Sequence, residues 1–219
     1  MNDNPSMTLL EKFLLLAIDS RTKQMYPLKP DVLSRAIAGA VLMDLALKNR
    51  IDNDLKDMFT VDPTPTGDDI LDPALQTMAQ APVLMPHPTT HWLKSFCEES
   101  DALRDKALRR LEQRGLLRRN SGGILWMFGL NRTPDADIRK INEIKSEILG
   151  ALYNNKVPAL HDILLIGLME SSGLTEYLLN ATELKDTAAR IAEIARMDLI
   201  SQAIAKGFPD EPPKLVAAS

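Results

Sequence analysis

The sequence contains a single cysteine, Cys97, so no disulfide bond can form within the chain and nothing indicates an oxidising compartment. It also lacks a long hydrophobic segment. The longest apolar runs, FLLLAI and ILLIGLM, fall far short of the ~20 residues that a membrane-spanning helix needs. The first residues, MNDNPSM, carry no basic region of the kind that opens a signal peptide. We therefore expect a cytoplasmic chain without a transmembrane helix.

Motifs that carry catalysis are absent as well. The sequence has no G-x-S-x-G nucleophile elbow, no G-x-x-x-x-G-K-[ST] phosphate loop, no G-x-G-x-x-G dinucleotide motif and no H-E-x-x-H metal motif. His87, His91 and Cys97 could suggest zinc, but Pro88 breaks the helical spacing of the histidines and a fourth ligand is missing. We expect no enzyme, no bound metal and no cofactor.

Charge is present but unevenly distributed. The chain has 219 residues, a formal net charge of −4 and 45% hydrophobic residues, enough to bury a core. Residues 101–119 hold seven Lys or Arg against three acidic residues, a local +4 that leaves −8 for the rest. One face could therefore attract anions, although most charge runs are only solvated surface.

Hydrophobic periodicity predicts a mainly α fold, a single helical domain with a core hydrophobic helix and short β-hairpins. We expect a disordered N-terminus at residues 1–6, the domain at 7–207 and a flexible tail at 208–219. In the first half of the chain, the patterns predict a helix over 9–18, a helix from Asp31 to near Asn49, a strand in DLKDMFTVD and a helical DILDPALQTM segment. An ordered loop over 81–94, a helix over 101–114 ending at Gly115 and a hairpin should follow. Beyond Pro134 we expect helices, of which LHDILLIGLMESSG is the buried central one.

Three aspartates precede or open the DILDPALQTM segment. Asp68, Asp69 and Asp72 could form a carboxylate site, but capping the N-terminus of a helix accounts for them more simply.

Two segments of the chain are similar to each other. LMDLALKNRI (42–51) and LRRLEQRGLL (108–117) align without gaps, with Asn49 opposite Gly115, and a strand candidate follows each. Both residues tolerate the left-handed conformation that ends a helix. We expect two helix-to-strand units of the same design, although any helix followed by a strand could produce this likeness.

The segment LLRRNSGGILWMF predicts a β-hairpin with Ser121-Gly122-Gly123 at its turn. Its second half is apolar and consists of Ile124, Leu125, Trp126, Met127 and Phe128. These side chains are candidates for membrane insertion or self-association, and the alternative is that they form the core of the hairpin itself.

Arg104 lies four residues before Leu108 and seven before Leu111, so it projects from the apolar line of its helix. A guanidinium there needs a carboxylate or a phosphate, because burying it unpaired is costly. Two interpretations remain open: an ion pair within the protein, or an external anion. The second expects Arg104 to lack a counter-charge within the protein, and it is overturned if Arg104 is locked onto a carboxylate of the chain with no accessible hollow beside it.

Four segments together suggest a family. MTLLEKFLLLAIDSRTK, LSRAIAGAVLMDLALKNRI, TPTGDDILDPAL, and LRRLEQRGLL followed by ILWMF resemble, in order and spacing, the Golgi phosphoprotein 3 family over about residues 7–205. The resemblance implies a mostly helical fold with a hydrophobic hairpin. The chain lacks the basic N-terminal segment of eukaryotic members, so we expect a short, bacterial member.

Eukaryotic members of that family bind phosphatidylinositol 4-phosphate on the cytosolic leaflet through a tryptophan and several arginines. Among those headgroup positions only Arg104 matches. The tryptophan position holds Lys29, and two further arginine positions hold Ala38 and Asp101.

From charge and local sequence we add Lys29, Arg35 and Lys106 to Arg104 as candidate headgroup ligands. The first hypothesis is thus a non-catalytic adaptor, peripheral on the cytosolic face of a membrane. Its partners would be an anionic phospholipid, a second copy of the chain bound through the hairpin, and a membrane-protein client.

Two other functions stay open. LRRLEQRGLLRR followed by a Gly-rich hairpin imitates the recognition helix and wing of winged-helix DNA-binding proteins. A pI near 5.5 argues against nucleic acid as a partner, because DNA-binding domains are usually strongly basic. The last alternative is a protein-interaction module without a ligand, in which Arg104 pairs with an acidic side chain of the chain.

Overall fold

The computed structural model of the chain describes residues 7–19, 21–22, 24–54, 57–81, 87–118, 135–154 and 157–207. Most of these residues are helical, and the strands are two to four residues long. This confirms the predicted fold class, a mainly α domain with short β-hairpins.

The helices are α1 (Leu9–Leu16), α2 (Pro30–Leu47), α3 (Leu71–Ala79), α4 (Thr89–Cys97), α5 (Ser100–Gln113), α6 (Ile138–Tyr153), α7 (Leu160–Ser172), α8 (Thr175–Leu178), α9 (Ala181–Ala195) and α10 (Leu199–Lys206). The strands, all antiparallel, are β1 (Ile18–Asp19) with β2 (Gln24–Met25), β3 (Ile51–Asn53) with β4 (Asp57–Thr60) and β5 (His87–Pro88) in that order, and β6 (Leu117–Arg118) with β7 (Asp135–Ala136).

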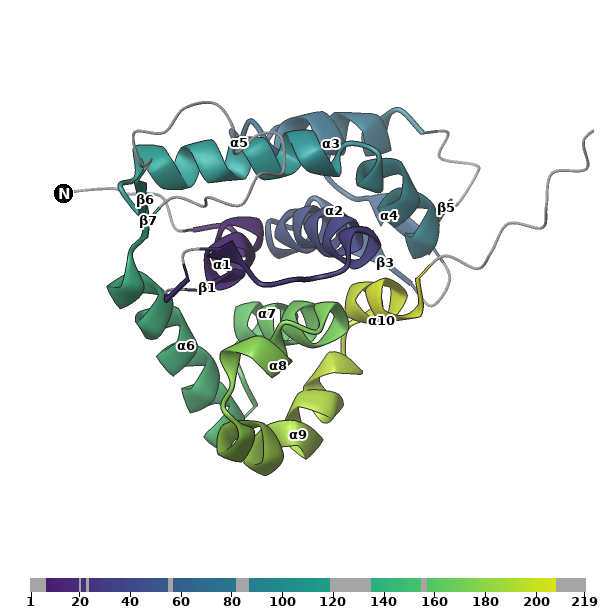
Figure 1. The fold of residues 1–219 in the computed structure, drawn as a ribbon. Coiled ribbons are helices and arrows are strands. Elements are labelled where there is room, and N and C mark those ends of the chain that lie inside the picture. Colours follow the sequence, from purple (N-terminus) through teal and green to yellow (C-terminus); the bar gives the residue numbers. More distant parts are fainter. Residues whose placement is uncertain are drawn as a thin grey trace, which may run out of the picture.

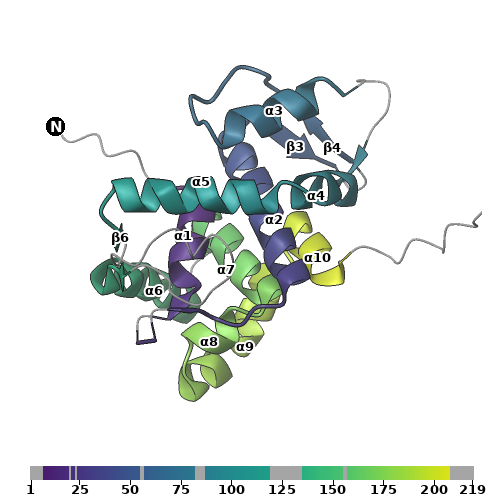
Figure 2. The ribbon, with the colours of Figure 1, turned by 45° about the horizontal axis from the view of Figure 1, so that its top comes forward.

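The helices form layers around α1 and α2. In Figure 1 these two helices lie between α3 and α5 on one side and α7 and α10 on the other, with α6 along one flank and α9 at the far end. Figure 2 shows α5 crossing over α1 and α2. Residues 36–45 of α2 and 164–169 of α7 are buried throughout. The expected buried helix, LHDILLIGLMESSG, is therefore central, and it shares that position with α2.

Helices α2 and α5 end in the same way. Asn49 and Gly115 follow them in the left-handed region, with φ of 53° and 71°. In both places this residue donates its N–H to the carbonyl three residues back, and the next N–H reaches five residues back. This pattern closes a helix and redirects the chain, here into β3 and β6. It confirms the predicted ends and the similar design of the two units.

Two helix starts differ slightly from expectation. Helix α2 begins at Pro30, with Lys29 as the residue before it, and Asp31 lies in the first turn. Proline suits the first helical position because its φ is fixed and its missing N–H needs no partner there. Helix α3 begins after Asp68, whose carboxylate accepts the N–H groups of Ile70 and Leu71 at 2.9 and 3.2 Å.

The prediction of an ordered loop over 81–94 was wrong. His87–Pro88 pairs with β4, and α4 begins at Thr89. Three residues of this nine-residue helix are buried, Trp92, Leu93 and Phe96, which is too few to show a period in the sequence. The Trp92 indole N–H donates to the carbonyl of Met58 at 3.1 Å. Tertiary packing thus fixes this helix where local pattern does not.

The expected hairpin after α5 is described only at its base. Leu117 and Arg118 form a strand, as predicted, and their partner in the described chain is Asp135–Ala136. The turn at 121–123 and the apolar segment 124–128 lie outside the described residues. Among the helices that are described, none is both long enough and apolar enough to span a membrane.

The contact between α2 and α10 depends on a glycine. A Cβ placed on Gly39 would lie 2.4 Å from Cδ1 and 3.1 Å from Cγ1 of Ile204, a fully buried side chain. Gly150 on α6 provides a contrast, because a Cβ there would meet nothing within 4 Å.

We predict that Gly39→Ala lowers the free energy of unfolding by about 2 kcal/mol, because overpacking outweighs the gain in helix propensity. The control Gly150→Ala should instead raise it by about 0.8 kcal/mol, since an exposed helical glycine gains from a methyl group. Urea unfolding monitored by circular dichroism measures both changes. Stabilisation by Gly39→Ala would contradict the proposed close contact.

Candidate functional site

Helix α5 carries most of the basic residues that the sequence singled out. Its buried side consists of Ser100, Leu103, Ala107, Leu108 and Leu111, which confirms the predicted apolar line. The five Lys and Arg residues of the helix and its cap therefore stand at the edges of that face or away from it, and the partners of each decide what it can bind.

Arg104 is held by carboxylates of its own helix. Its Nη1 lies 2.9 Å from an Asp101 oxygen, and its Nε lies 3.6 Å from an Asp105 oxygen. The Arg104 side chain is 25% exposed and that of Asp101 is 85% exposed. Arg104 thus has counter-charges within the protein, which the external-anion interpretation did not expect. The ion pair within the protein is the alternative that the structure contains.

Lys29 and Arg35 lie at the start of α2, and this end of the helix touches the start of α5. The hydroxyl groups of Ser34 and Ser100 are 3.1 Å apart. Arg35 is tied to the protein: Nη1 lies 3.0 Å from Asp31, and Nε donates to the carbonyl of Ile204 at the end of α10. Lys29 is exposed.

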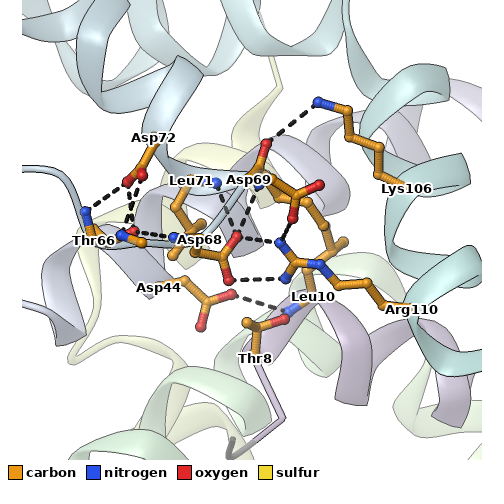
Figure 3. A network of polar contacts seen from close by, with 12 residues as sticks. Thr8, Leu10, Asp44, Thr66, Asp68, Asp69, Leu71, Asp72, Lys106 and Arg110 are labelled. Carbon is orange, nitrogen blue, oxygen red and sulfur yellow. Dashed lines mark hydrogen bonds and ion pairs between the residues drawn. The ribbon is translucent and has the colours of Figure 1, made fainter. Parts of the chain in front are cut away.

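Lys106 lies on another side of α5. Its ammonium donates to the carbonyl oxygen of Asp69 at 3.3 Å, a contact drawn in Figure 3. The four predicted headgroup residues therefore do not converge on one point in the described structure. Arg104 and the start of α2 form one region, and Lys106 belongs to a second region built around Asp68 and Asp69.

That second region surrounds a cavity of about 560 Å³. Its walls come from the start of α1, the end of α2, residues 66–69, α5, and His161 near the start of α7. Arg110 projects into it from α5 and makes two hydrogen bonds to Asp68, at 2.8 and 2.5 Å, and a third to Asp69. Figure 3 shows this fork between the two aspartates.

The Asp68–Arg110 pair is strong because both side chains are mostly buried, each 16% exposed. Burial alone would raise the pKa of Asp68, but the hydrogen bonds from the Arg110 guanidinium hold it below its usual value. Asp72 is separately engaged, accepting from the backbone N–H and the hydroxyl of Thr66. The predicted capping role of these aspartates is confirmed for Asp68.

Asp44 is one of the residues that line the cavity. It comes from the last turns of α2, is 5% exposed, and accepts the N–H groups of Leu9 and Leu10 at 2.8 and 3.3 Å. One helix thus caps the start of another. Burial raises the pKa of Asp44 to about 7, against the lowering effect of the two backbone N–H groups, and the nearby Asp68 and Glu11 charges raise it further.

Glu11 completes the acidic cluster. Its side chain is fully buried, and Oε2 accepts the N–H of Thr8 at 2.9 Å and lies 3.4 Å from Arg114. Thr8 returns a bond to the N–H of Glu11, which completes a capping box at the start of α1. The arginines of this region are thus neutralised by carboxylates of the protein.

Sequence reasoning missed this cluster. Asp68 and Arg110 are 42 residues apart, and Asp44 is 35 residues from Leu9, so no local spacing links them. In the described part of the chain, no group of three or more His, Cys, Asp and Glu side chains is placed to hold a metal ion. The rings of His87 and His91 stack on each other, with centroids 4.3 Å apart.

The ion pairs of the α5 arginines limit what these side chains can bind. Arg104, Arg110 and Arg114 contact carboxylates of the protein and are partly buried. Among the arginines of α5 and its cap, Arg109 is the exposed one. A recognition helix needs several arginines directed outward, toward phosphates and base edges. The described part of α5 does not present such a surface.

Comparison with protein families gives a match to the Golgi phosphoprotein 3 (GPP34) family model over residues 9–208, nearly the whole chain. The chain belongs to the Golgi phosphoprotein 3 family. No curated protein matches it. The resemblance drawn from the four sequence segments is thereby confirmed. In this member of the family, the cavity beside Arg110 does not include Arg104, so α5 contributes to two separate regions.

We predict that Asp44 gives the protein a pH-dependent stability. Its folded pKa of about 7 exceeds the value of 3.8 for a free carboxyl, so the folded state holds a proton that the unfolded chain releases, and stability falls as pH rises toward 7. In urea unfolding, the stability of the wild type relative to Asp44→Asn should fall by about 3 kcal/mol between pH 5 and pH 8. Parallel pH profiles would show that Asp44 does not titrate in this range.

We also predict that Arg110→Met destabilises the fold by about 3 kcal/mol, because it leaves the Asp68 carboxylate buried without its counter-charge. Arg139→Met is the matched control: Arg139 is 94% exposed on α6, so its loss should change stability by less than about 0.5 kcal/mol. Thermal and urea unfolding measure both. Equal effects of the two variants would refute a special role for the Asp68 pair.

Proposed function

We propose that this member of the Golgi phosphoprotein 3 family is a non-catalytic adaptor that binds peripherally to anionic phospholipid on the cytosolic face of a membrane. Arg104 is the proposed headgroup contact. Family membership supports the general role, and the nature of the ion pair at Arg104 supports the site.

The observation that carries the proposal is the exposure of Asp101. Both partners of Arg104 belong to its own helix, and the closer one, Asp101, has an 85% exposed side chain. An exposed pair three residues apart on a helix contributes only about 0.3–0.5 kcal/mol. A phosphate that accepts two hydrogen bonds from the guanidinium fork is a stronger partner, so it can displace Asp101.

We propose different roles for the other basic candidates, Lys29, Arg35 and Lys106. Lys29 is exposed at the start of α2, which meets the start of α5 at Ser34 and Ser100, so we propose it as the second contact. Arg35 and Lys106 are engaged with Asp31 and with the Asp69 carbonyl. We propose that these two contribute to the local electrostatic potential without direct contact.

Stable attachment usually takes two signals, such as charge and an apolar insertion. We propose that Ile124, Leu125, Trp126, Met127 and Phe128, which lie outside the described residues, provide the second signal. The same segment is the proposed route to self-association, and a membrane-protein client is the remaining proposed partner.

Flotation with vesicles tests the site. Vesicles of phosphatidylcholine alone are compared with vesicles that also contain phosphatidylglycerol. We predict that Arg104→Ala lowers the partition constant for anionic vesicles about fivefold, because one basic residue near an anionic surface contributes about 1 kcal/mol, and that Asp101→Ala raises it. Arg139→Ala removes an equally charged but remote side chain and should have little effect.

Two results would contradict the proposal. Binding that is equal for neutral and anionic vesicles would remove the electrostatic basis. A loss that is the same for Arg104→Ala and Arg139→Ala would show that only net charge matters. The first outcome would favour the ligand-free interaction module, and the second would remove Arg104 as the specific headgroup contact.

A further inference from the structure

Lys29 lies at the end of a short irregular segment, residues 26–29, that joins β2 to α2. At the start of this segment, the N–H of Tyr26 donates to the carbonyl of Ala17 at 2.9 Å, and at its end the Lys29 carbonyl accepts a backbone N–H of α2 at 2.9 Å. The buried residues of α2 begin only at Ala36. Because helix ends without buried side chains fray, the position of Lys29 depends on how this segment is held.

Two prolines make the segment stiff. Pro27 and Pro30 each have a fixed φ, and each restricts the residue before it to extended conformations. Lys29 accordingly has φ of −61° and ψ of 136°. A segment with so few accessible conformations transmits its direction from Tyr26 to Lys29. A contact that holds Tyr26 therefore also orients Lys29.

Such a contact comes from a helix that is remote in sequence. The ring of Tyr177 stacks on the ring of Tyr26, with centroids 5.0 Å apart and an angle of 21° between the ring planes. Tyr177 belongs to α8, and Figure 2 shows the chain that leads into α2 passing next to this helix. Aromatic pairs at this spacing stabilise a structure beyond the area they bury.

Helix α8 is itself firmly attached to the core. Leu174 and Leu178 are buried, and the buried hydroxyl of Thr175 donates to the Glu170 carboxylate on α7 at 2.8 Å. The side chain of Tyr177 differs from these neighbours, because the residue is 42% exposed. Tyr177 thus projects from a fixed base, and the ring contact described for it is the one with Tyr26.

We infer that Tyr177 is a positioning residue of the proposed headgroup site, and that its stacking on Tyr26 holds the stiff segment 26–29 so that Lys29 is in place to contact an anionic headgroup. This inference rests on the proposed function, since Lys29 is the second contact named there. Tyr177 acts through Lys29 and not through a contact of its own with lipid. Removing the Tyr177 ring therefore matters only while Lys29 is present.

Flotation with the same neutral and anionic vesicles tests this dependence. Lys29→Ala should lower the partition constant for anionic vesicles about fivefold. Tyr177→Ala should lower it about threefold, because loss of the stacking reduces the fraction of molecules in which Lys29 is in place. The double variant should bind like Lys29→Ala alone. Circular dichroism checks that each variant is folded.

Two further variants separate the stacking from other effects of the substitution. Tyr177→Phe keeps the ring and should bind like the wild-type chain. Tyr153→Ala removes a comparable ring, 53% exposed at the end of α6, and should leave vesicle binding unchanged.

Hydrogen exchange without vesicles tests the contact with Tyr26 directly. The N–H groups of Tyr26 and Leu28 donate to carbonyls within the described chain, so their exchange reports opening of the segment. In Tyr177→Ala both should exchange about threefold faster, whereas the buried part of α2, residues 36–45, should be unchanged. Unchanged exchange of Tyr26 and Leu28 would overturn the inference.

The vesicle results distinguish failure of the inference from failure of the proposed function. Wild-type binding by Tyr177→Ala, together with a loss for Lys29→Ala, overturns the inference and leaves the proposed function intact. Additive losses in the double variant also overturn it, because Tyr177 would then act independently of Lys29. A loss in Tyr177→Phe equal to that in Tyr177→Ala has the same consequence, since stacking would not be the cause. Equal binding of the wild-type chain to neutral and anionic vesicles overturns the proposed function and the inference together.

Discussion

The guanidinium of Arg110, held between Asp68 and Asp69, fixes how α5 lies against the start of α3. Removing either partner would leave a mostly buried charge unpaired, which costs far more than the pair contributes over an apolar substitute. Asp44 works at the same junction, since its carboxylate closes the start of α1 from the end of α2. Four helices thus meet around charges that must stay satisfied, and this requirement limits how that end of the molecule can vary.

This constraint explains why Arg110 and Arg114, at the end of a basic sequence segment, are directed toward carboxylates of the protein. Near the end of α5, Arg110 and Arg114 face carboxylates from the segment before α3 and from α1. In the part of the chain that the structure describes, the carboxylates that contact Arg104 in the first turns of α5 come from α5 itself. Arg104 pairs only with neighbours on its own helix, and these pairs can exchange with solvent or a ligand. The two ends differ in the burial of the acidic partners, because Asp101 is 85% exposed whereas Asp68 is 16% exposed and Glu11 is fully buried.

Local patterns predicted the features whose causes are local. The left-handed residues Asn49 and Gly115 were read from their positions after apolar helices, and both end a helix by the same two hydrogen bonds. The Asp101–Arg104 pair also had a local signal, since residues three apart on a helix face each other. The cluster around Asp68 had none, because its members are joined only by tertiary packing, and the short helix α4 had too few buried residues to show a period.

The two ends of α5 tolerate substitution to different degrees. Asp101 is 85% exposed, and its described side-chain contact is the pair with Arg104, so exchanging it for another residue costs the fold little. Asp68 and Arg110 allow no such exchange, because each would leave the other buried without a counter-charge. The charge beside Arg104 is therefore free to vary while the helix stays in place.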